Sequence, residues 1–400
     1  MGEIVKLICV TKDNNNKVYE MHALGNGFWE ARWGRIAGSM SRMTYPMSNW
    51  DQKYHEKIRK GYKDITDIVS TSTDSSHDTF DVIGAGPQVV ELINFLQAAS
   101  RGVIKRNYTV SIADITLQQI QKAQQVLDVL VALSKKKKFE KDHVNASLLE
   151  MYHIIPRQMG DVRDHLLSDN DSASFMKLLS HEQDLLDIVQ GQVSTQSPAV
   201  KNGSSNVLDL SALGLSIDLA NSTQIDEIRA KTDYNVDKAL NIYAVSHTTH
   251  DTDYNSLKIS NEKLLYHGSR NENWWSILNQ GLRIRPSNAV HTGSMFGDGI
   301  YGANKARKSI GYTSLHGSYW ASGTSKKAYI ALYRFNLGKS WDLLKNENHQ
   351  SWMTRLDDAT VAAKKYNSVF ARGGYDLKND EYIVYDAHRC TIKYLIEIGV

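Results

Sequence analysis

The chain has 400 residues, 41% of them apolar and 23% charged, which is enough for two to three domains with hydrophobic cores of their own. Its 47 Lys and Arg nearly balance its 44 Asp and Glu, so the net charge of +3 indicates no particular class of partner. No stretch approaches the roughly 18 apolar residues of a membrane helix, and the first ten residues, which include Glu3 and Lys6, make a poor signal peptide. The only cysteines, Cys9 and Cys390, exclude a disulfide scaffold and a Cys-rich zinc finger. We therefore expect a soluble, intracellular protein with several domains.

Two stretches have the composition of linkers. Residues 70–79 (STSTDSSHDT) are small, polar or acidic, and residues 194–206 (STQSPAVKNGSSN) mix Ser, Gly, Pro and Asn. These stretches predict three blocks of residues, which we take in chain order.

The first block combines strands with a local excess of positive charge. Apolar runs at 4–10, 17–24 and 28–36, separated by the turn-forming sequences NNN and LGNG, predict three strands, and the polar stretch 48–63 suits a helix. Residues 1–63 carry eleven Lys or Arg against six Asp or Glu, a net charge of +5. This local excess is more informative about a partner than the balance of the whole chain.

The middle block predicts helices, and the last block mixes both kinds of element. Pro87 suits the first turn of a helix, and Thr116 with Gln119 forms a capping box before apolar residues at helical spacing. Residues 181–190 form another amphipathic segment. The strand-like runs KAYIALYRFNL, EYIVYDA and IKYLIEIGV of the last block alternate with short helices and Gly-rich loops, which indicates an α+β domain.

The segment FWEARWGRIAG (28–38) is the first specific motif. Packing at the edge of a core, beside solvated arginines, is the simpler interpretation of any single tryptophan. The order Trp33-Gly34-Arg35 after an aromatic strand nevertheless resembles the WGR domain, a small module that binds DNA ends. An exposed Trp can stack on a base or sugar while Arg neutralises phosphate, so the resemblance implies that Trp33 and Arg35 bind DNA.

Two glycine motifs and a lysine run carry less weight. The segment 84–87 (GAGP) follows a polar stretch, and residues 297–302 (GDGIYG) match G-x-G-x-x-G without the strand–helix–strand unit that a Rossmann fold requires. We therefore reject a Rossmann dinucleotide site. The run Lys135–Lys138 suits the solvated end of a helix, with a nuclear address or a phosphate contact as the alternative.

Three segments of the last block carry candidate chemistry: LLYHGSRNENWWSILNQGLRI (264–284), MFGDGIYGANKARKSIGY (295–312) and NDEYIVYD (379–386). In this order and spacing they resemble the catalytic domain of the poly(ADP-ribose) polymerases. The His-Tyr-Glu triad of that family falls on His267, Tyr301 and Glu381. A buried structural histidine or an edge-strand glutamate would explain each residue taken alone.

The resemblance extends over most of the chain. Residues 246–255 resemble the family segment that precedes the His strand, and residues 114–130 and 152–161 resemble the helical regulatory domain. The implied fold class is a multidomain α+β protein with a small β-rich WGR domain, an all-α regulatory bundle and a mixed α/β ADP-ribosyltransferase domain with antiparallel sheets. The implied domains are residues 1–70, 80–195 and 207–400.

The same resemblance implies that NAD+ is a substrate, the donor of ADP-ribose, and that the enzyme needs neither a cofactor nor a metal. His267 would bind the adenine ribose, and Glu381 would bind the nicotinamide ribose, stabilise the cationic transition state and help to activate the acceptor. Gly268 and Ser309 would grip the carboxamide, and the rings of Tyr301 and Tyr312 would enclose the nicotinamide. The adenosine side would be lined by Ser269, Asn273 and Arg283.

The expected function is transfer of ADP-ribose to protein side chains, with extension to poly(ADP-ribose), stimulated by DNA breaks and serving repair or damage signalling. Transfer of a single ADP-ribose, or a DNA-binding protein with a weakly active transferase scaffold, are the alternatives. Ser294 and Gly302 depart from the aromatic residues usual in the family, which puts chain elongation in doubt. The implied partners are DNA ends, acceptor proteins including the chain itself, and no membrane. A eukaryotic host would imply the nucleus, and any other host the cytoplasm.

Regulation is implied by the order of domains. In this family the helical domain restrains access to the NAD+ site, and DNA contact through the WGR domain releases it by a shift in population. 

Overall fold

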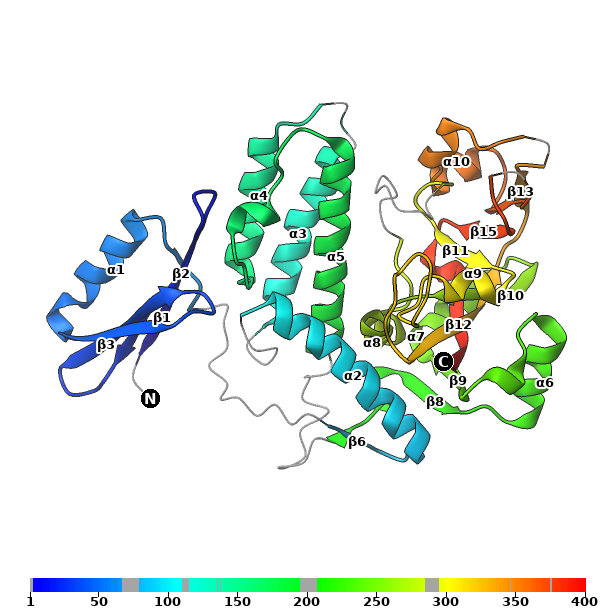
Figure 1. Ribbon diagram of the computed structural model, residues 1–400, viewed down its shortest axis with the longest axis horizontal. Coiled ribbons are helices and arrows are strands. Elements are labelled where there is room, and N and C mark those ends of the chain that lie inside the picture. The colour runs from blue at the N-terminus through cyan, green and yellow to red at the C-terminus, as the bar shows by residue number, and fades with distance from the viewer. Residues whose placement is uncertain are drawn as a thin grey trace. The chain divides into compact units, whose positions relative to one another are not determined.

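The structure is a computed structural model that describes residues 3–66, 79–109, 115–134, 136, 138–194, 207–284, 295–345, 347–374 and 376–400. Packing divides the chain into two compact units (Figure 1). The first comprises Met1–Ser76 and Gly102–Ser194, and the second comprises His77–Arg101 and Thr195–Val400. The division falls within one helix, whereas the sequence predicted boundaries at 70–80 and 195–207; those domain limits stay a prediction.

A five-stranded sheet opens the first unit, in the order β4-β3-β2-β1-β5. Its strands are antiparallel and comprise β1 (Ile4–Thr11), β2 (Asn15–Ala23), β3 (Phe28–Arg35), β4 (Met40–Pro46) and β5 (Lys63–Asp64). Helix α1 (Trp50–Arg59) packs Trp50 edge-on against Trp29, which is fully buried, with ring centroids 5.4 Å apart. The three predicted strands are confirmed, and the predicted helix is shorter than 48–63. Strand β4 escaped prediction because its residues are almost all exposed and show no apolar alternation.

Three helices complete the first unit: α3 (Leu117–Ser134), α4 (Lys141–Ile154) and α5 (Ser172–Ser194), which lie side by side in Figure 1. The capping box before α3 is confirmed. Gln119 N donates to Thr116 Oγ1 at 3.2 Å, and Thr116 N donates to Gln119 Oε1 at 2.9 Å. Apolar side chains at helical spacing, among them Ile120, Leu127 and Leu130, are buried between the helices.

The second unit is built on a nine-stranded sheet in the order β13-β14-β15-β11-β10-β12-β16-β9-β8. Neighbouring strands are antiparallel except β13 and β14, which are parallel and depart from the expected antiparallel pattern. The strands are β8 (Leu215–Leu219), β9 (Asn241–His247), β10 (Glu262–Gly268), β11 (Ile300–Ala303), β12 (Lys327–Asn336), β13 (Ser340–Leu343), β14 (Ser368–Ala371), β15 (Glu381–Val384) and β16 (Cys390–Gly399). A short parallel pair, β6 (Asp81–Val82) and β7 (Val207–Leu208), lies outside this sheet.

Helices cover the nine-stranded sheet: α2 (Pro87–Asn107), α6 (Ser222–Lys231), α7 (Thr248–Ser256), α8 (Asn271–Gln280), α9 (Ala306–Ile310) and α10 (Asp358–Ala363). Short 3-10 helices lie at Met47–Asn49, Val162–His165, Ser211–Leu213, Val236–Lys238, Ser351–Arg355 and Ala387–Arg389. Helix α2 begins at Pro87, as predicted.

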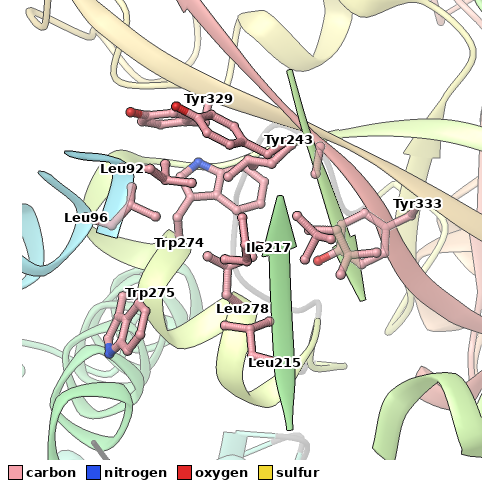
Figure 2. Close-up of a cluster of buried hydrophobic side chains, with 14 of the residues drawn as sticks. Leu92, Leu96, Leu215, Ile217, Tyr243, Trp274, Trp275, Leu278, Tyr329 and Tyr333 are labelled. Carbon is pink, nitrogen blue, oxygen red and sulfur yellow. The ribbon is translucent and has the colours of Figure 1, made fainter. Parts of the chain in front are cut away.

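The largest core of the second unit joins α2, α8 and the sheet. Figure 2 shows Leu92 and Leu96 of α2 beside Trp274 of α8, with Tyr329 of β12 above that ring in this view. All four side chains are at most 1% exposed. An aromatic ring of this size removes on the order of 200 Å² from water, worth about 5 kcal/mol of transfer free energy. Burial of α8 against α2 therefore anchors the segment that follows the His267 strand.

Some of the predicted features lie partly outside the described residues. The linker 194–206, apart from Ser194, and most of the linker 70–79 lie outside the described residues, as do Lys135 and Lys137 of the lysine run. Cys9 and Cys390 are buried and unpaired. Among the described helices, none is both long and apolar enough to cross a membrane.

Candidate active site

Three neighbouring strands carry the predicted catalytic residues: His267 on β10, Tyr301 on β11 and Glu381 on β15. β11 lies between the other two, pairing Tyr266 with Ala303 on one side and Ala303 with Glu381 on the other. Residues far apart in the sequence thus meet across one antiparallel sheet. His267 lies within its strand, one residue before the strand ends at Gly268.

The ring of His267 is oriented by the neighbouring strand. Its Nδ1 lies 3.2 Å from the carbonyl oxygen of Tyr301. A carbonyl only accepts, so Nδ1 carries the proton and the neutral ring presents Nε2 as an acceptor. Burial lowers the pKa of His267, which keeps the ring neutral near pH 7. The geometry suits acceptance of a hydrogen bond from a substrate hydroxyl.

The hydroxyl of Tyr301 is fixed by the loop that precedes its own strand. It donates to the carbonyl oxygen of Gly297 at 2.9 Å and accepts from Phe296 N at 3.0 Å. Burial raises the pKa of Tyr301, so the phenol stays protonated. With both hydrogen bonds made inside the protein, the ring is left to act through its face and not as a proton donor to substrate.

Glu381 is a buried carboxylate, 5% exposed, with a cation beside it. Its Oε1 accepts a hydrogen bond from Nζ of Lys308. The Lys308 side chain is itself only 15% exposed. Burial raises the pKa of Glu381, and Lys308 counters part of that rise. A desolvated carboxylate of this kind can stabilise a cationic carbon or accept a proton from a hydroxyl.

Lys308 and Ser309 come from the one-turn helix α9, which packs closely against the end of β10. A Cβ on Gly268 would lie 1.9 Å from the carbonyl oxygen of Ser309, so only glycine allows this approach. Ser309 is 4% exposed. The structure therefore brings Gly268 and Ser309 together, and their shared contact with the carboxamide stays a prediction.

Tyr312 follows α9 and belongs to a group of rings. It stacks on Trp320 with centroids 6.1 Å apart and planes at 21°. Burial, with a smaller effect of the Glu381 charge, raises the pKa of Tyr312 to about 12. Trp320 is 45% exposed and was not predicted as part of the site.

The residues expected on the adenosine side lie around α8. Asn273 Nδ2 donates to Ser269 Oγ at 3.1 Å, which joins two of them at the start of the helix. Helix α8 ends at Gln280, with Gly281 as its C-cap, and Arg283 is exposed two residues further on. It precedes residues 285–294, which lie outside the described residues and include Ser294.

Gly302 has a packing explanation. A Cβ at this position would lie 2.9 Å from Cζ of Phe335 and 3.0 Å from the side chain of Leu265. The departure from an aromatic residue therefore reflects a filled core behind β11. The same glycine belongs to an antiparallel pair, in agreement with the rejection of a Rossmann site.

The predicted DNA-binding residues have partners within the first unit. Trp33 is half-buried and stacks on Tyr19, with centroids 6.2 Å apart. Arg35 donates to the side chain of Asn14 at 2.8 Å and to the carbonyl oxygen of Gly160 at 2.6 Å. Arg35 thus connects the N-terminal sheet to the segment that follows α4. DNA binding by these residues stays a prediction.

Sequence reasoning missed Lys308. The signal available was its place one residue before Ser309, which puts it on the same short helix, but nothing local pairs it with Glu381, 73 residues away. Within the described residues no cluster of three or more His, Cys, Asp or Glu has the arrangement of a metal site.

Comparison with known proteins agrees with this geometry. Residues 222–400 match the family model described as the poly(ADP-ribose) polymerase catalytic domain. Poly [ADP-ribose] polymerase 2 of Homo sapiens is 31% identical over 162 residues, which cover 35% of this chain and 27% of the human protein. Poly [ADP-ribose] polymerase 1 of Danio rerio is 23% identical over 415 residues, which cover 93% of this chain and 38% of the fish protein.

A viral relative matches over more of its own length. Uncharacterized protein 101L of Invertebrate iridescent virus 6 is 27% identical over 233 residues, which cover 58% of this chain and 95% of the viral protein. The chain thus spans well under half of the two vertebrate polymerases and nearly all of the viral protein.

Proposed function

Because residues 222–400 place the chain in the poly(ADP-ribose) polymerase family, a family of NAD+ ADP-ribosyltransferases, we propose that it transfers ADP-ribose from NAD+ to protein side chains and extends it to poly(ADP-ribose). We further propose that DNA breaks stimulate the reaction. The observation that carries the proposal is the buried Glu381 on β15, which pairs with the strand of Tyr301, and that strand pairs in turn with the strand of His267.

In the proposed reaction the bond between ribose C1 and nicotinamide breaks, and its electron pair leaves with nicotinamide. The ring departs neutral and needs no general acid. Gly268 and Ser309 hold the carboxamide, and the faces of Tyr301 and Tyr312 enclose the ring, which fixes the reacting bond in place. His267 accepts a hydrogen bond from the adenine ribose through Nε2.

Glu381 acts at the centre where positive charge develops. Its carboxylate binds the 2′-hydroxyl of the nicotinamide ribose and stabilises the oxocarbenium-like transition state. The acceptor oxygen then bonds to C1, and its proton passes to Glu381 and on to solvent. The positive charge of Lys308 favours the ionised carboxylate, because it opposes part of the effect of burial on the pKa of Glu381.

Stimulation by DNA is supported by the first unit. Residues 1–63 carry a net charge of +5, and this excess of positive charge attracts the phosphates of DNA. Arg35 links the sheet to Gly160 beyond α4. Contact of DNA with Trp33 and Arg35 competes with these internal contacts and so favours a different state of the helices.

The test is nicotinamide release from NAD+ by the purified chain, with and without short DNA that bears a 5′-phosphorylated break. Release that rises steeply with DNA supports both proposals. Release that ignores DNA keeps the transferase and removes the regulation. No release under either condition contradicts the transferase and favours a DNA-binding protein.

Transfer of a single ADP-ribose is the alternative that product size decides. Electrophoresis of the modified chain separates a ladder of long polymers from a single shifted band. A single band at saturating NAD+ contradicts elongation and leaves the donor chemistry intact.

A further inference from the structure

Helix α9 carries two site residues but lacks an N-terminal cap of its own. It is five residues long, Ala306–Ile310, and its N-cap residue is Lys305, whose side chain makes no capping hydrogen bond. Ser, Thr, Asp and Asn are the residues that accept from the free N–H groups of a first turn, and lysine cannot. A single helical turn is also too short to be stable alone. Something outside α9 must hold it in place.

The missing acceptor comes from Asp233. Its Oδ1 accepts a hydrogen bond from Ala306 N at 3.1 Å, and Oδ2 lies 3.6 Å from Nζ of Lys305. The carboxylate therefore does for α9 what an N-cap residue normally does, from 73 positions earlier in the chain. Negative charge at this end also suits the helix dipole.

Asp233 is itself held in place. Thr232 Oγ1 donates to the carbonyl oxygen of Ile228 at the end of α6. Val236, three residues beyond Asp233, is buried in the same cluster as Ile228 and as Ala306 of α9. The segment that presents the carboxylate and the helix that receives it thus share one core.

The core that holds α9 also includes the neighbour of His267, because Tyr266 is buried in the same cluster as Ala306 and Val236. The pKa of the buried Tyr266 hydroxyl is raised, mainly by burial, and the Asp233 charge adds to the rise. Tyr266 directly precedes His267 on β10. The helix that Asp233 caps therefore shares its core with the strand of His267.

We propose that Asp233 is a positioning residue of the transferase site, which caps α9 from outside and so fixes Lys308 against Glu381 and Ser309 against Gly268. It does not touch the substrate. The proposal rests on the function proposed above, since the residues it positions are those that hold nicotinamide and Glu381. Its essential element is the hydrogen bond to Ala306 N, because a pair as exposed as Asp233 with Lys305 contributes little.

Four variants of the full chain separate the hydrogen bond from the charge. Asp233→Ala removes both, Asp233→Asn keeps an acceptor oxygen, and Lys305→Met removes only the ion pair. Asp237→Ala is the matched control, because it removes a carboxylate from the same segment that is 77% exposed and pairs with Arg229, not with α9.

The first measurement is NAD+ turnover. We expect Asp233→Ala to raise KM for NAD+ about fivefold, the scale of one lost capping interaction, and the other three variants to stay within about twofold of the unaltered chain. A mere loss of folded protein would lower the apparent kcat and leave KM unchanged. Equal KM values in Asp233→Ala and Asp237→Ala would overturn the proposal.

The second measurement does not need an active enzyme. Hydrogen exchange of the peptide that contains α9 should become faster in Asp233→Ala and stay unchanged in Asp233→Asn and Asp237→Ala. Unchanged exchange in Asp233→Ala overturns the role of Asp233 whatever the activity. If exchange is faster in Asp233→Ala but the unaltered chain releases no nicotinamide, the cap is supported and the proposed function is contradicted.

Discussion

Lys308 sets the state of the carboxylate on which the proposed chemistry depends. Burial raises the pKa of Glu381, and the Lys308 charge lowers it, so the ionised form is kept to a lower pH than burial alone would allow. The Glu381 charge also raises the pKa values of two tyrosines, Tyr301 and Tyr312, though less than burial does. Both stay neutral near pH 7, whereas Lys308 carries the positive charge that opposes the effect of burial on the pKa of Glu381.

Substitution of Lys308 by Met should therefore change the dependence of the rate on pH. With the opposing charge gone, the pKa of Glu381 rises further, and the acidic limb of the rate profile moves to higher pH. Nicotinamide release measured across pH 5 to 9 tests this. Arg307→Met is the control, since Arg307 is the exposed neighbour on α9. A profile unchanged by Lys308→Met would show that the pair does not govern the ionisation.

Glu381→Gln tests the carboxylate itself. An amide can still hydrogen-bond a ribose hydroxyl, but it cannot stabilise positive charge or take a proton from the acceptor. We expect polymer to disappear and nicotinamide release to fall by at least tenfold, as gel electrophoresis and turnover would measure. Chains of normal length in this variant would refute the role given to Glu381.

At this scale the sequence identified residues but not all of their partners. His267, Tyr301 and Glu381 stood out because their segments resemble a known order of motifs. Lys308 did not, because an ion pair between α9 and β15 depends on how the sheet brings distant segments together. Asp233 is a clearer case, because nothing in the sequence around it indicates that it caps a helix 73 residues later in the chain.

A buried ion pair joins α5 to the segment that follows α4 in the first unit. Arg157 Nη1 lies 2.7 Å from Oε2 of Glu182 on α5, and the two side chains are 2% and 1% exposed. Tyr152 of α4 donates to the other carboxylate oxygen at 3.2 Å. Two guanidinium nitrogens of Arg157, Nε and Nη2, have no hydrogen-bond partner within the described chain.

Arg157→Met should therefore destabilise the helices strongly. It leaves Glu182 buried without its cation, which costs about 3–5 kcal/mol, and circular dichroism should show an earlier thermal transition. The double variant Arg157→Met with Glu182→Leu should recover most of the loss, because no charge is then left buried. A single variant as stable as the unaltered chain would contradict the importance of the pair.

Elements with a strong apolar pattern were predictable, and those without one were not. The capped start of α3 and the strands β1 to β3 follow directly from local sequence. Strand β4 has almost no buried side chain, so its place in the sheet depends on pairing with β3 and not on its own composition. The parallel pair of β13 and β14 likewise depends on the path of the intervening chain.

For the molecule as a whole, Arg35 is the residue that best tests the proposed response to DNA. Arg35→Ala removes its hydrogen bonds to Asn14 and Gly160 along with its positive charge. We expect stimulation by broken DNA to be lost while release without DNA persists, as nicotinamide assays would show. Arg32→Ala on the same strand is the control, because Arg32 pairs with Glu30 and is 45% exposed. Full stimulation of the Arg35 variant would point to another DNA sensor.

The core around Trp274 bears on how small an active fragment can be. The family match begins at residue 222. Four side chains that precede this residue in the sequence nevertheless belong to the core around Trp274: Leu92 and Leu96 of α2, and Leu215 and Ile217 of β8 (Figure 2). A protein cut at 222 would lose these side chains, uncover large aromatic rings and open an edge of the sheet at β9. Expression trials should therefore keep α2 with the transferase, because the segment that matches the family model is shorter than the segment whose side chains form its core.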